Sequence, residues 1–360
     1  MNIMQMVSGV EVSGAAVHCG LLARELARRG HHVTLVCRPG AWIQRVVAGE
    51  PVAVVESDLD RWPPSELRRM TAIARERGIE VVHTHMSRAH SFGILLRWSA
   101  GVPCVATAHN QNIQLHWMLN DAVIAVSEAT RRYHRRRNFV RRHRIETIHN
   151  FIDAAAIAAV DADAGGATRA RFGIDPDAPL IGAIGTVIPR KGLVHLVRAL
   201  PRVLAAMQNA RLLVVGDQPG RHAADLRHMA AALGVGTSIV WAGRVSGSAT
   251  ILAALDVLVL ASIEEPFGLV AGEAMAAGLA VVATAVDGVP ECVSDNQTGV
   301  LVPPADSTAL ADAIIALLRD PERRRQLGAA GRRRVREHFA PETQVPRIEA
   351  VLARAAARAY

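Results

Sequence analysis

Glu265 and Glu273 are the residues whose type and spacing most clearly suggest chemistry. Seven residues separate them in the stretch SIEEPFGLVAGEAMAAG, with Gly268 and the expected start of a helix between them. Carboxylates accept hydrogen bonds from hydroxyl groups, and the free N–H groups of a helix N-terminus bind anions. The stretch therefore suits a polyhydroxylated, anionic ligand. The structural alternative is an N-cap role for Glu265 and a buried partner for Glu273.

Arg190 and Lys191 form a second candidate, followed by Gly192 between an expected strand and an expected helix. Adjacent cations before a helix can neutralise a diphosphate. Lys191 is the only lysine among 41 basic residues, and lysine and arginine are not interchangeable where geometry is tight. The segment does not match a Walker A loop. A solvated basic turn is the alternative.

Gly14 marks a third candidate, in the first loop, SGVEVSGAA. A glycine there allows the backbone to approach a ligand at a helix N-terminus. The loop lacks the G-x-G-x-x-G fingerprint, so an ordinary turn is equally compatible.

Three histidines could instead indicate a metal hydrolase, because His83, His85 and His109 lie at the ends of expected strands. However, a strand places His83 and His85 on one face, where a cleft without metal also needs polar groups. Acidic ligands are not evident, so we expect no metal site. The Asp161-x-Asp163 pair falls in an expected linker and is expected to be solvated.

Short Val- and Ile-rich runs alternate with helical patterns along the chain, which predicts buried parallel strands between helices. The expected strands are residues 2–7, 33–37, 52–55, 80–83, 104–107, 122–126, 145–149, 180–187, 212–215, 239–241, 257–260, 280–283 and 299–302. The expected helices are residues 15–29, 64–76, 89–98, 193–207, 223–233, 249–254, 268–277 and 308–319.

The predicted fold class is therefore α/β, with two doubly wound, Rossmann-like domains facing a central cleft. We expect a first domain at 1–153 and an Ala-, Asp- and Gly-rich linker at 154–168. A second domain would cover 169–340, and a final helix at 341–360 would pack back across the junction. Ligands of such sheets bind at the carboxyl ends of the strands.

Composition narrows the class of protein further. Half of the 360 residues are hydrophobic, which excludes wholesale disorder, and four dispersed cysteines exclude a disulfide scaffold or a cysteine zinc site. We find no signal peptide pattern and no convincing apolar membrane span, and we expect a cytoplasmic protein, with peripheral membrane binding as an option. The net charge of +8 suggests an acidic partner.

The most basic segment, RRYHRRRNFVRRHR, holds eight arginines. These are Arg131, Arg132, Arg135, Arg136, Arg137, Arg141, Arg142 and Arg144. We favour docking on an anionic membrane surface or an acidic acceptor. A solvated helix face is the next alternative. Nucleic acid is the least favoured partner, because no recognised nucleic-acid motif accompanies the arginines.

Taken together, these segments resemble the retaining, GT-B-fold glycosyltransferases of family 4 (glycosyl transferases group 1). The Glu265-x7-Glu273 stretch is similar to that family's signature, and Arg190-Lys191-Gly192 stands where the family holds the donor diphosphate. The sequences VIAVSE at 123–128, IHNFID at 148–153, AGRV at 242–245 and VDGVPE at 286–291 also resemble family segments, in the family's order.

The resemblance implies a role for each matching residue. Glu265 would contact the donor sugar, Glu273 the nucleotide ribose, and Lys191 with Arg190 the leaving diphosphate. His109 matches the first-domain histidine near the sugar, and Gly14 would close over the phosphates. The backbone amides of Phe267, Gly268 and Leu269 would bind sugar or phosphate oxygens, and the loop with Arg244 and Val245 the base.

Two positions depart from the family pattern. The family usually has Gly-Arg at the start of its phosphate loop, where this chain has Gly185-Thr186, so one expected cation is missing. The usual Asn-Gly before the linker is Asn150-Phe151.

The resemblance implies a hexosyltransferase-type enzyme that moves a sugar from a nucleotide-diphosphate donor to an acceptor, with retention and without a metal or other cofactor. The acceptor would be a lipid-linked or cell-envelope glycan. Two alternatives remain: a nucleotide-sugar epimerase or hydrolase on the same fold, and a non-catalytic basic protein that binds polyanions or membranes.

Overall fold

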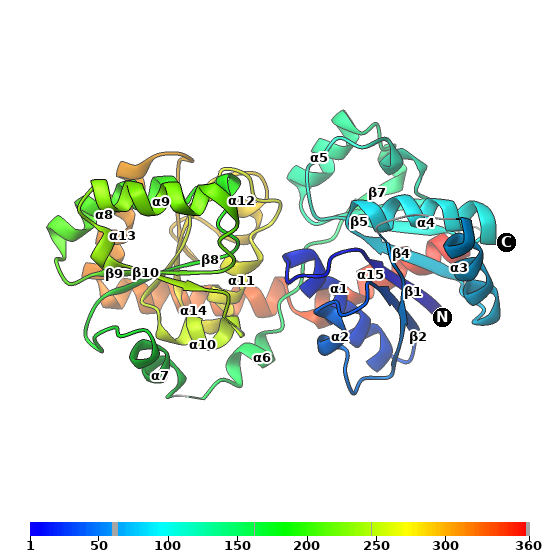
Figure 1. Ribbon diagram of the computed structural model, residues 1–360, viewed down its shortest axis with the longest axis horizontal. Helices are drawn as coiled ribbons and strands as arrows, with labels where there is room; N and C mark the ends of the chain where they lie inside the picture. Colours follow the sequence, from blue (N-terminus) through cyan, green and yellow to red (C-terminus); the bar gives the residue numbers. More distant parts are fainter. Residues whose placement is uncertain (60–63, 162, 246, 358–360) are drawn as a thin grey trace. The chain divides into compact units, whose positions relative to one another are not determined.

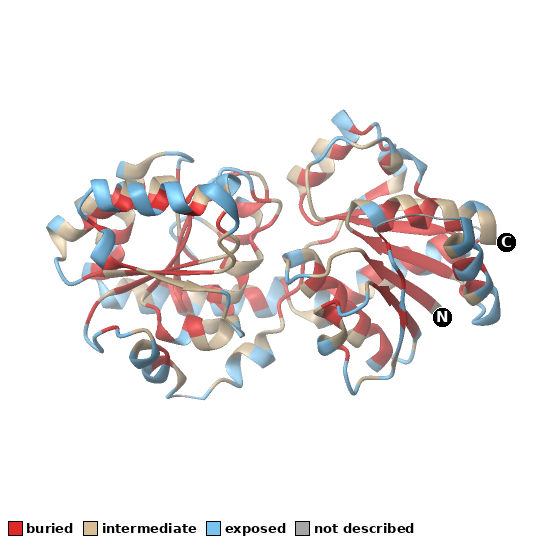
Figure 2. Ribbon diagram, viewed as in Figure 1, coloured by how far each residue is buried: buried red, intermediate tan, exposed pale blue. Residues whose placement is uncertain are grey.

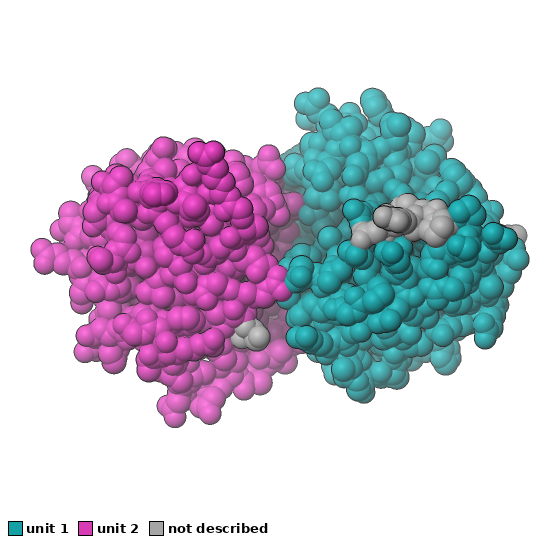
Figure 3. All heavy atoms as spheres, in the orientation of Figure 1, with its two compact units in different colours: residues 1–151, 341–360 teal, residues 152–340 magenta. Residues whose placement is uncertain are grey.

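The computed structural model describes residues 1–59, 64–161, 163–245 and 247–357. The chain divides into two compact units, coloured separately in Figure 3. Unit 1 consists of residues 1–151 and 341–360, and unit 2 of residues 152–340. Each unit is described by itself below.

Unit 1 is built on a seven-stranded parallel sheet in the order β3-β2-β1-β4-β5-β6-β7. The strands are β1 (Asn2–Val7), β2 (His32–Cys37), β3 (Val52–Glu56), β4 (Val81–His85), β5 (Cys104–Ala108), β6 (Ala122–Ala125) and β7 (Ile145–Thr147). The order reverses between β1 and β4, and the loops that follow these two neighbouring parallel strands lie at the same edge of the sheet.

Helices cover both faces of this sheet, as Figure 1 shows. Buried apolar residues of α1 and of α15 share one core with Val81 and Val105, while those of α3 and α4 share another with Met4 and Val82. The helices are α1 (Gly14–Arg28), α2 (Ile43–Val46), α3 (Pro64–Glu76), α4 (Ser87–Ala100), η1 (Leu115–Leu119), α5 (Glu128–Arg137), η2 (Arg142–Arg144) and α15 (Pro341–Ala356).

Unit 2 repeats this plan with a six-stranded parallel sheet in the order β10-β9-β8-β11-β12-β13. The strands are β8 (Leu180–Ile184), β9 (Arg211–Val215), β10 (Ile239–Gly243), β11 (Val257–Leu260), β12 (Ala280–Thr284) and β13 (Val300–Val302). Here the order reverses between β8 and β11, which brings the loops after these strands to one edge.

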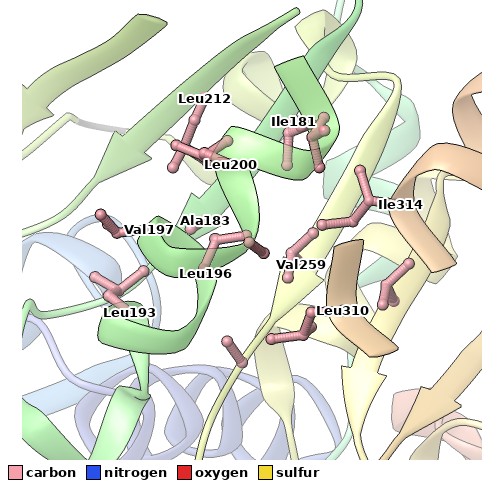
Figure 4. Packing of buried hydrophobic residues seen from close by; sticks show 14 of the residues in the cluster. Ile181, Ala183, Leu193, Leu196, Val197, Leu200, Leu212, Val259, Leu310 and Ile314 are labelled. Carbon is pink, nitrogen blue, oxygen red and sulfur yellow. The ribbon is translucent and has the colours of Figure 1, made fainter. Parts of the chain in front are cut away.

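The helices of unit 2 are α6 (Ala154–Ala158), α7 (Ala164–Arg171), η3 (Pro189–Lys191), α8 (Leu193–Ala206), α9 (Gly220–Ala232), η4 (Gly236–Ser238), α10 (Ser248–Ala254), α11 (Leu269–Ala277), α12 (Val289–Cys292), α13 (Ser307–Arg319) and α14 (Pro321–His338). Leu196 of α8 and Ile314 of α13 pack over Ile181 and Val259 in the core shown in Figure 4. The central strands are buried, the edge strand β3 is partly exposed, and the helices expose their outer sides, as Figure 2 shows.

The parallel sheets and flanking helices confirm the predicted fold class within each unit, and several boundaries differ from expectation. Residues 154–168, expected to be a linker, contain α6 and the start of α7 and belong to unit 2. The strand expected at 180–187 ends at Ile184, because Gly185 has a φ of +142° that leaves the extended region. The arginine-rich segment is not one helix: α5 ends at Arg137, and Phe139 has a φ of +53°.

No described helix is both long and apolar enough to cross a membrane.

Candidate active site

Lys191 and Glu265, far apart in sequence, meet at the edge of unit 2 where the strand order reverses. The Lys191 Nζ atom lies 2.5 Å from Glu265 Oε2. Lys191 follows β8 and Glu265 follows β11, so the sheet topology itself brings the two loops together. A small cavity of about 20 Å³ borders Lys191, Gly185 and Ser262. With the pair closed, this space is sufficient for about one water molecule.

Close backbone packing holds the two loops in register. The Arg190 carbonyl accepts a hydrogen bond from the Ile263 N–H at 2.9 Å. Gly192 has a φ of +64°, and a Cβ atom there would lie 1.9 Å from the Ala261 carbonyl oxygen. Only glycine therefore fits next to Lys191, and this glycine fixes the lysine loop against the glutamate loop.

Glu265 is itself positioned by several neighbours. The Ser262 hydroxyl donates to Glu265 Oε2 at 3.2 Å, and the Glu265 N–H donates to Asp287 Oδ2 at 2.9 Å. The Gly288 N–H donates to the Glu265 carbonyl at 3.2 Å. Because Glu265 is buried, and both Lys191 and Ser262 bond to its Oε2 atom, its carboxylate is oriented before any ligand binds.

The N-terminus of α11 begins three residues beyond Glu265. Gly268 is the N-cap with a φ of +94°, and Phe267 is anchored by a T-shaped contact with Phe339. The first amides of α11, from Leu269 onward, have no partner within the helix, as at every helix start. They provide a partial positive charge beside the Lys191–Glu265 pair.

Glu273 lies on α11 inside the unit, where burial raises the pKa of its carboxyl. A side-chain hydrogen bond with Ser248 opposes that shift. Arg244 and Val245 follow β10, two strands from β8. Arg244 Nε donates to Asp217 Oδ1 at 2.7 Å, and this hydrogen bond lowers the pKa of Asp217.

The candidate residues of unit 1 lie after β1, on β4 and after β5. Gly14 is exposed at the start of α1, where the Ser13 side chain caps the helix. His109 follows β5, and its Nε2 atom lies 3.0 Å from His85 Nδ1. His83, also on β4, lies 2.7 Å from the Thr107 hydroxyl through its Nε2 atom. These histidines bond to one another and to neutral polar groups. Among the described residues, no cluster of three or more His, Cys, Asp or Glu could hold a metal ion.

A family model described as "Glycosyl transferases group 1" matches residues 166–334, and one described as "Glycosyltransferase Family 4" matches residues 12–156. A D-inositol 3-phosphate glycosyltransferase of Xylanimonas cellulosilytica is 32% identical and covers 89% of this chain and 87% of its own. The chain belongs to the group 1 glycosyltransferases of family 4.

Other relatives of this glycosyltransferase are similar over comparable lengths. The N-acetyl-alpha-D-glucosaminyl L-malate synthase of Bacillus anthracis is 27% identical over 94% of this chain and 93% of its own. The crystal structure of Anabaena HepE in complex with UDP and glucose superposes with a TM-score of 0.89 at 20% identity, covering 98% of this chain and 99% of that one. That superposition shows a GT-B glycosyltransferase fold.

Several site residues of this glycosyltransferase were not expected from the sequence. Ser262 and Asp287, which hold Glu265, are ordinary loop residues with no signal of their own. Gln5 offers a signal in retrospect: it is a buried polar side chain within the otherwise apolar part of β1. Thr186, where the family has arginine, is half-buried and brings no cation to the site.

The eight arginines expected to form a docking patch lie on α5 and in the segment after it. Arg132, Arg135, Arg136, Arg137, Arg141 and Arg142 are exposed, while Arg131 and Arg144 are half-buried. Arg131 is paired with Glu128 at 3.0 Å.

Exposed apolar side chains accompany these arginines. Leu115 is 76% exposed and Phe139 68%. Asn138, at the end of α5, binds the backbone of Asn112 and Gln114 at 2.9 and 2.8 Å, so the segment carrying Leu115 is fixed to α5.

Proposed function

We propose that this glycosyltransferase moves a sugar from a nucleotide-diphosphate donor to an acceptor hydroxyl with retention of anomeric configuration. The observation that carries the proposal is the Lys191–Glu265 pair beside the N-terminus of α11. Cleavage of the sugar–nucleotide bond builds negative charge on the diphosphate and positive charge on the anomeric carbon. Lys191, Arg190 and the α11 amides would stabilise the first, and Glu265 would face the second.

In this proposal the donor separates the ion pair. The diphosphate takes the ammonium of Lys191, and a sugar hydroxyl donates to Glu265. Because each group exchanges one charge-assisted partner for another, neither is left unpaired when the donor binds. No protein nucleophile is assigned, and no metal is required, since cations and amides of the chain neutralise the leaving group.

The remaining donor contacts are proposed from the resemblance to the family. Glu273 would accept from the ribose hydroxyls, the loop of Arg244 and Val245 would border the base, and Gly14 would approach the phosphates. His109 would contact a sugar hydroxyl. The base stays open, because relatives differ: Anabaena HepE is described in complex with UDP, whereas a Corynebacterium relative is named as GDP-mannose-dependent.

We infer that the acceptor is anionic and is presented at a lipid surface. The exposed arginines of α5 support an anionic partner, and the neighbouring Leu115 and Phe139 support contact with lipid. Relatives named as acting on a phosphatidylinositol mannoside and on inositol 3-phosphate are consistent with an acidic acceptor.

The first experiment is a thermal shift of the wild type against UDP, GDP and ADP. A ligand at about 100 times its Kd adds about 2.7 kcal/mol to the free energy of unfolding. We expect one nucleotide to stabilise the wild type and Lys191→Ala to lose that stabilisation. Arg202→Ala is the control, because Arg202 pairs with Asp312 on the exposed side of the same unit.

Product analysis with the matching nucleotide sugar completes the test. Transfer to an acceptor with the anomeric configuration kept supports the proposal. Sugar released or epimerised without an acceptor supports the hydrolase or epimerase alternative. Stabilisation by none of the nucleotides contradicts the donor site and favours the non-catalytic alternative.

A further inference from the structure

A continuous chain of hydrogen bonds runs through the buried interior of unit 1 and ends at His109. Thr107 Oγ1 lies 2.7 Å from His83 Nε2, and His83 Nδ1 lies 3.1 Å from Gln5 Nε2. Gln5 Oε1 lies 3.0 Å from His85 Nε2, and His85 Nδ1 lies 3.0 Å from His109 Nε2.

The strand register explains how these residues meet. Gln5 of β1 is paired with His83 of β4, and His85 of β4 is paired with Thr107 of β5. Alternate residues of a strand share a face, so all four side chains point to the same side of the sheet. All four are fully or almost fully buried, which leaves their polar atoms dependent on one another.

The amide of Gln5 gives the chain a direction. An amide oxygen only accepts hydrogen bonds, so His85 must carry its proton on Nε2. A neutral imidazole has one proton, so His85 Nδ1 is an acceptor and His109 must donate to it from Nε2. The proton of His109 is thus on Nε2, and its Nδ1 atom carries a lone pair.

The same orientation of the Gln5 amide sets the direction of the other half of the chain. The amide nitrogen of Gln5 donates to His83 Nδ1, which leaves the His83 proton on Nε2, where it can be donated to Thr107 Oγ1. Every link therefore joins one donor to one acceptor. Burial lowers the pKa of His85 and of His109 well below the usual range, in keeping with neutral rings.

The titratable neighbours of His109 are also histidines. His18 of α1 lies with its ring centre 5.1 Å from that of His109, and His90 of α4 and His83 of β4 act on it through longer-range repulsion. Among the described residues of these elements and of α15, no carboxylate shifts the pKa of His85 or His109. The charge of a neighbouring acid therefore does not select the tautomer.

We propose that Gln5, acting through His85, sets the tautomer of His109 so that His109 can only accept a hydrogen bond through Nδ1. Nδ1 has no hydrogen-bond partner among the described residues, and His109 is half-buried rather than enclosed. The partner it suits is a hydroxyl that donates, such as one on a sugar. Gln5 and His85 are positioning residues. The assignment rests on the proposed function only in naming a sugar hydroxyl as that partner.

Nitrogen NMR of the full chain labelled at histidine tests the tautomer directly. In the wild type at pH 7.5, we expect His109 to show a protonated Nε2 and an unprotonated Nδ1. A protonated Nδ1 would overturn the proposal without any variant. His109→Asn identifies the resonances by their disappearance.

A matched pair of variants tests the role of Gln5. Gln5→Met keeps the side-chain shape and removes the amide, so we expect His109 to populate both tautomers. Gln44→Met is the control, because Gln44 belongs to the same unit but binds Arg38 and Glu56 instead. An unchanged His109 spectrum in folded Gln5→Met would overturn the proposal, and if this variant does not fold, the wild-type spectrum decides.

Turnover separates this inference from the proposed function. We expect Gln5→Met to lower kcat several-fold while nucleotide stabilisation stays at the wild-type level, since the amide is in unit 1 and Lys191 is in unit 2. If NMR shows the expected tautomer but the protein has no transfer activity, the contact between His109 and a sugar hydroxyl is overturned and the tautomer assignment is kept. Full activity with the opposite tautomer would overturn the inference and keep the proposed function.

Discussion

Lys191 and Glu265 neutralise each other in the free glycosyltransferase, so removing either side chain is expected to lower the free energy of unfolding. Both side chains are largely shielded from solvent, so Lys191→Met leaves an uncompensated carboxylate. We expect a loss of about 1–3 kcal/mol in the free energy of unfolding, and a smaller total loss in the double variant Lys191→Met/Glu265→Gln than the two single losses added. Urea denaturation of the four proteins measures the coupling. Additive losses would mean that the pair contributes no interaction energy.

Gly192 provides a second test at the scale of one residue. Gly192→Ala adds a Cβ atom 1.9 Å from the Ala261 carbonyl oxygen, and we expect a loss of more than about 3 kcal/mol because the lysine loop must move. Gly173→Ala is matched to it: its φ is +63°, and nothing lies within 4 Å of the added atom. That control should lose only about 1–2 kcal/mol of backbone strain, and equal losses would rule out the steric contact.

For single residues, the sequence identifies the charged residues of the site more readily than the residues that position them. Lys191 and Glu265 could be selected because one is the only lysine and the other precedes a helix. Ser262 could not, because its importance depends on a partner brought close by loop packing. Gln5 stands out only as a polar residue in an apolar strand, and its partners are supplied by the strand register. The orientation of the Gln5 amide depends on its hydrogen-bond partners in the folded protein, which the sequence does not specify locally.

At the scale of elements, α5 and the segment fixed to it make the surface proposed to meet the membrane. Arg135→Glu/Arg136→Glu removes two exposed cations, each worth about 1 kcal/mol near an anionic bilayer, so binding should weaken about thirtyfold or more. Co-sedimentation with vesicles containing phosphatidylserine measures it, with pure phosphatidylcholine for comparison.

The control is Arg333→Glu/Arg336→Glu on α14, which changes the net charge equally from two exposed positions in unit 2. Equal weakening in both variants would mean that net charge alone, and not the α5 surface, attracts the protein to lipid.

The strands and most of the long helices were predictable from the sequence, because their apolar residues recur with the period of the element. Helix α14, the longest described, and α5 were not among the expected helices, since both are rich in arginine and have few apolar residues. The short helices α6 and α7 were not, since their Ala, Gly and Asp residues are equally typical of a linker. Their helical state depends on tertiary contacts: the Thr168 hydroxyl donates to the Thr250 carbonyl, and Gly165 packs closely against Ala253. Asp161 and Asp163 lie on the exposed side of this segment, and residue 162 is outside the described residues.

At the scale of the whole molecule, the fifteen histidines are unevenly shared, with eleven among residues 1–151. Burial lowers the pKa of His18 and His83 to about 3, against about 6.5 in an unfolded chain. Below about pH 6.5 the unfolded state therefore binds more protons, and stability falls as pH decreases toward 3. Each such histidine costs up to about 1.4 kcal/mol per pH unit in this window.

We therefore expect unit 1 to unfold before unit 2 when the pH is lowered from 7 to 4. Hydrogen exchange followed by mass spectrometry measures protection in each unit separately. Earlier loss of protection in unit 2 would contradict the prediction. His83→Leu/His18→Leu would flatten the pH dependence if it folds, and His31→Leu, at a partly exposed position, is the matched control.

Helix α15 gives the chain an unusual order of completion during synthesis. Unit 2 is finished once residue 340 has left the ribosome, but the sheet of unit 1 still lacks the helix that supplies Val345, Ile348 and Leu352 to its core. The strands of unit 1 are thus translated first, but the apolar core of unit 1 is the last to be completed. Until the final turns emerge, Val81, Val105 and Ile124 are without part of their apolar cover, and a nascent chain stalled near residue 340 would expose that surface to aggregation.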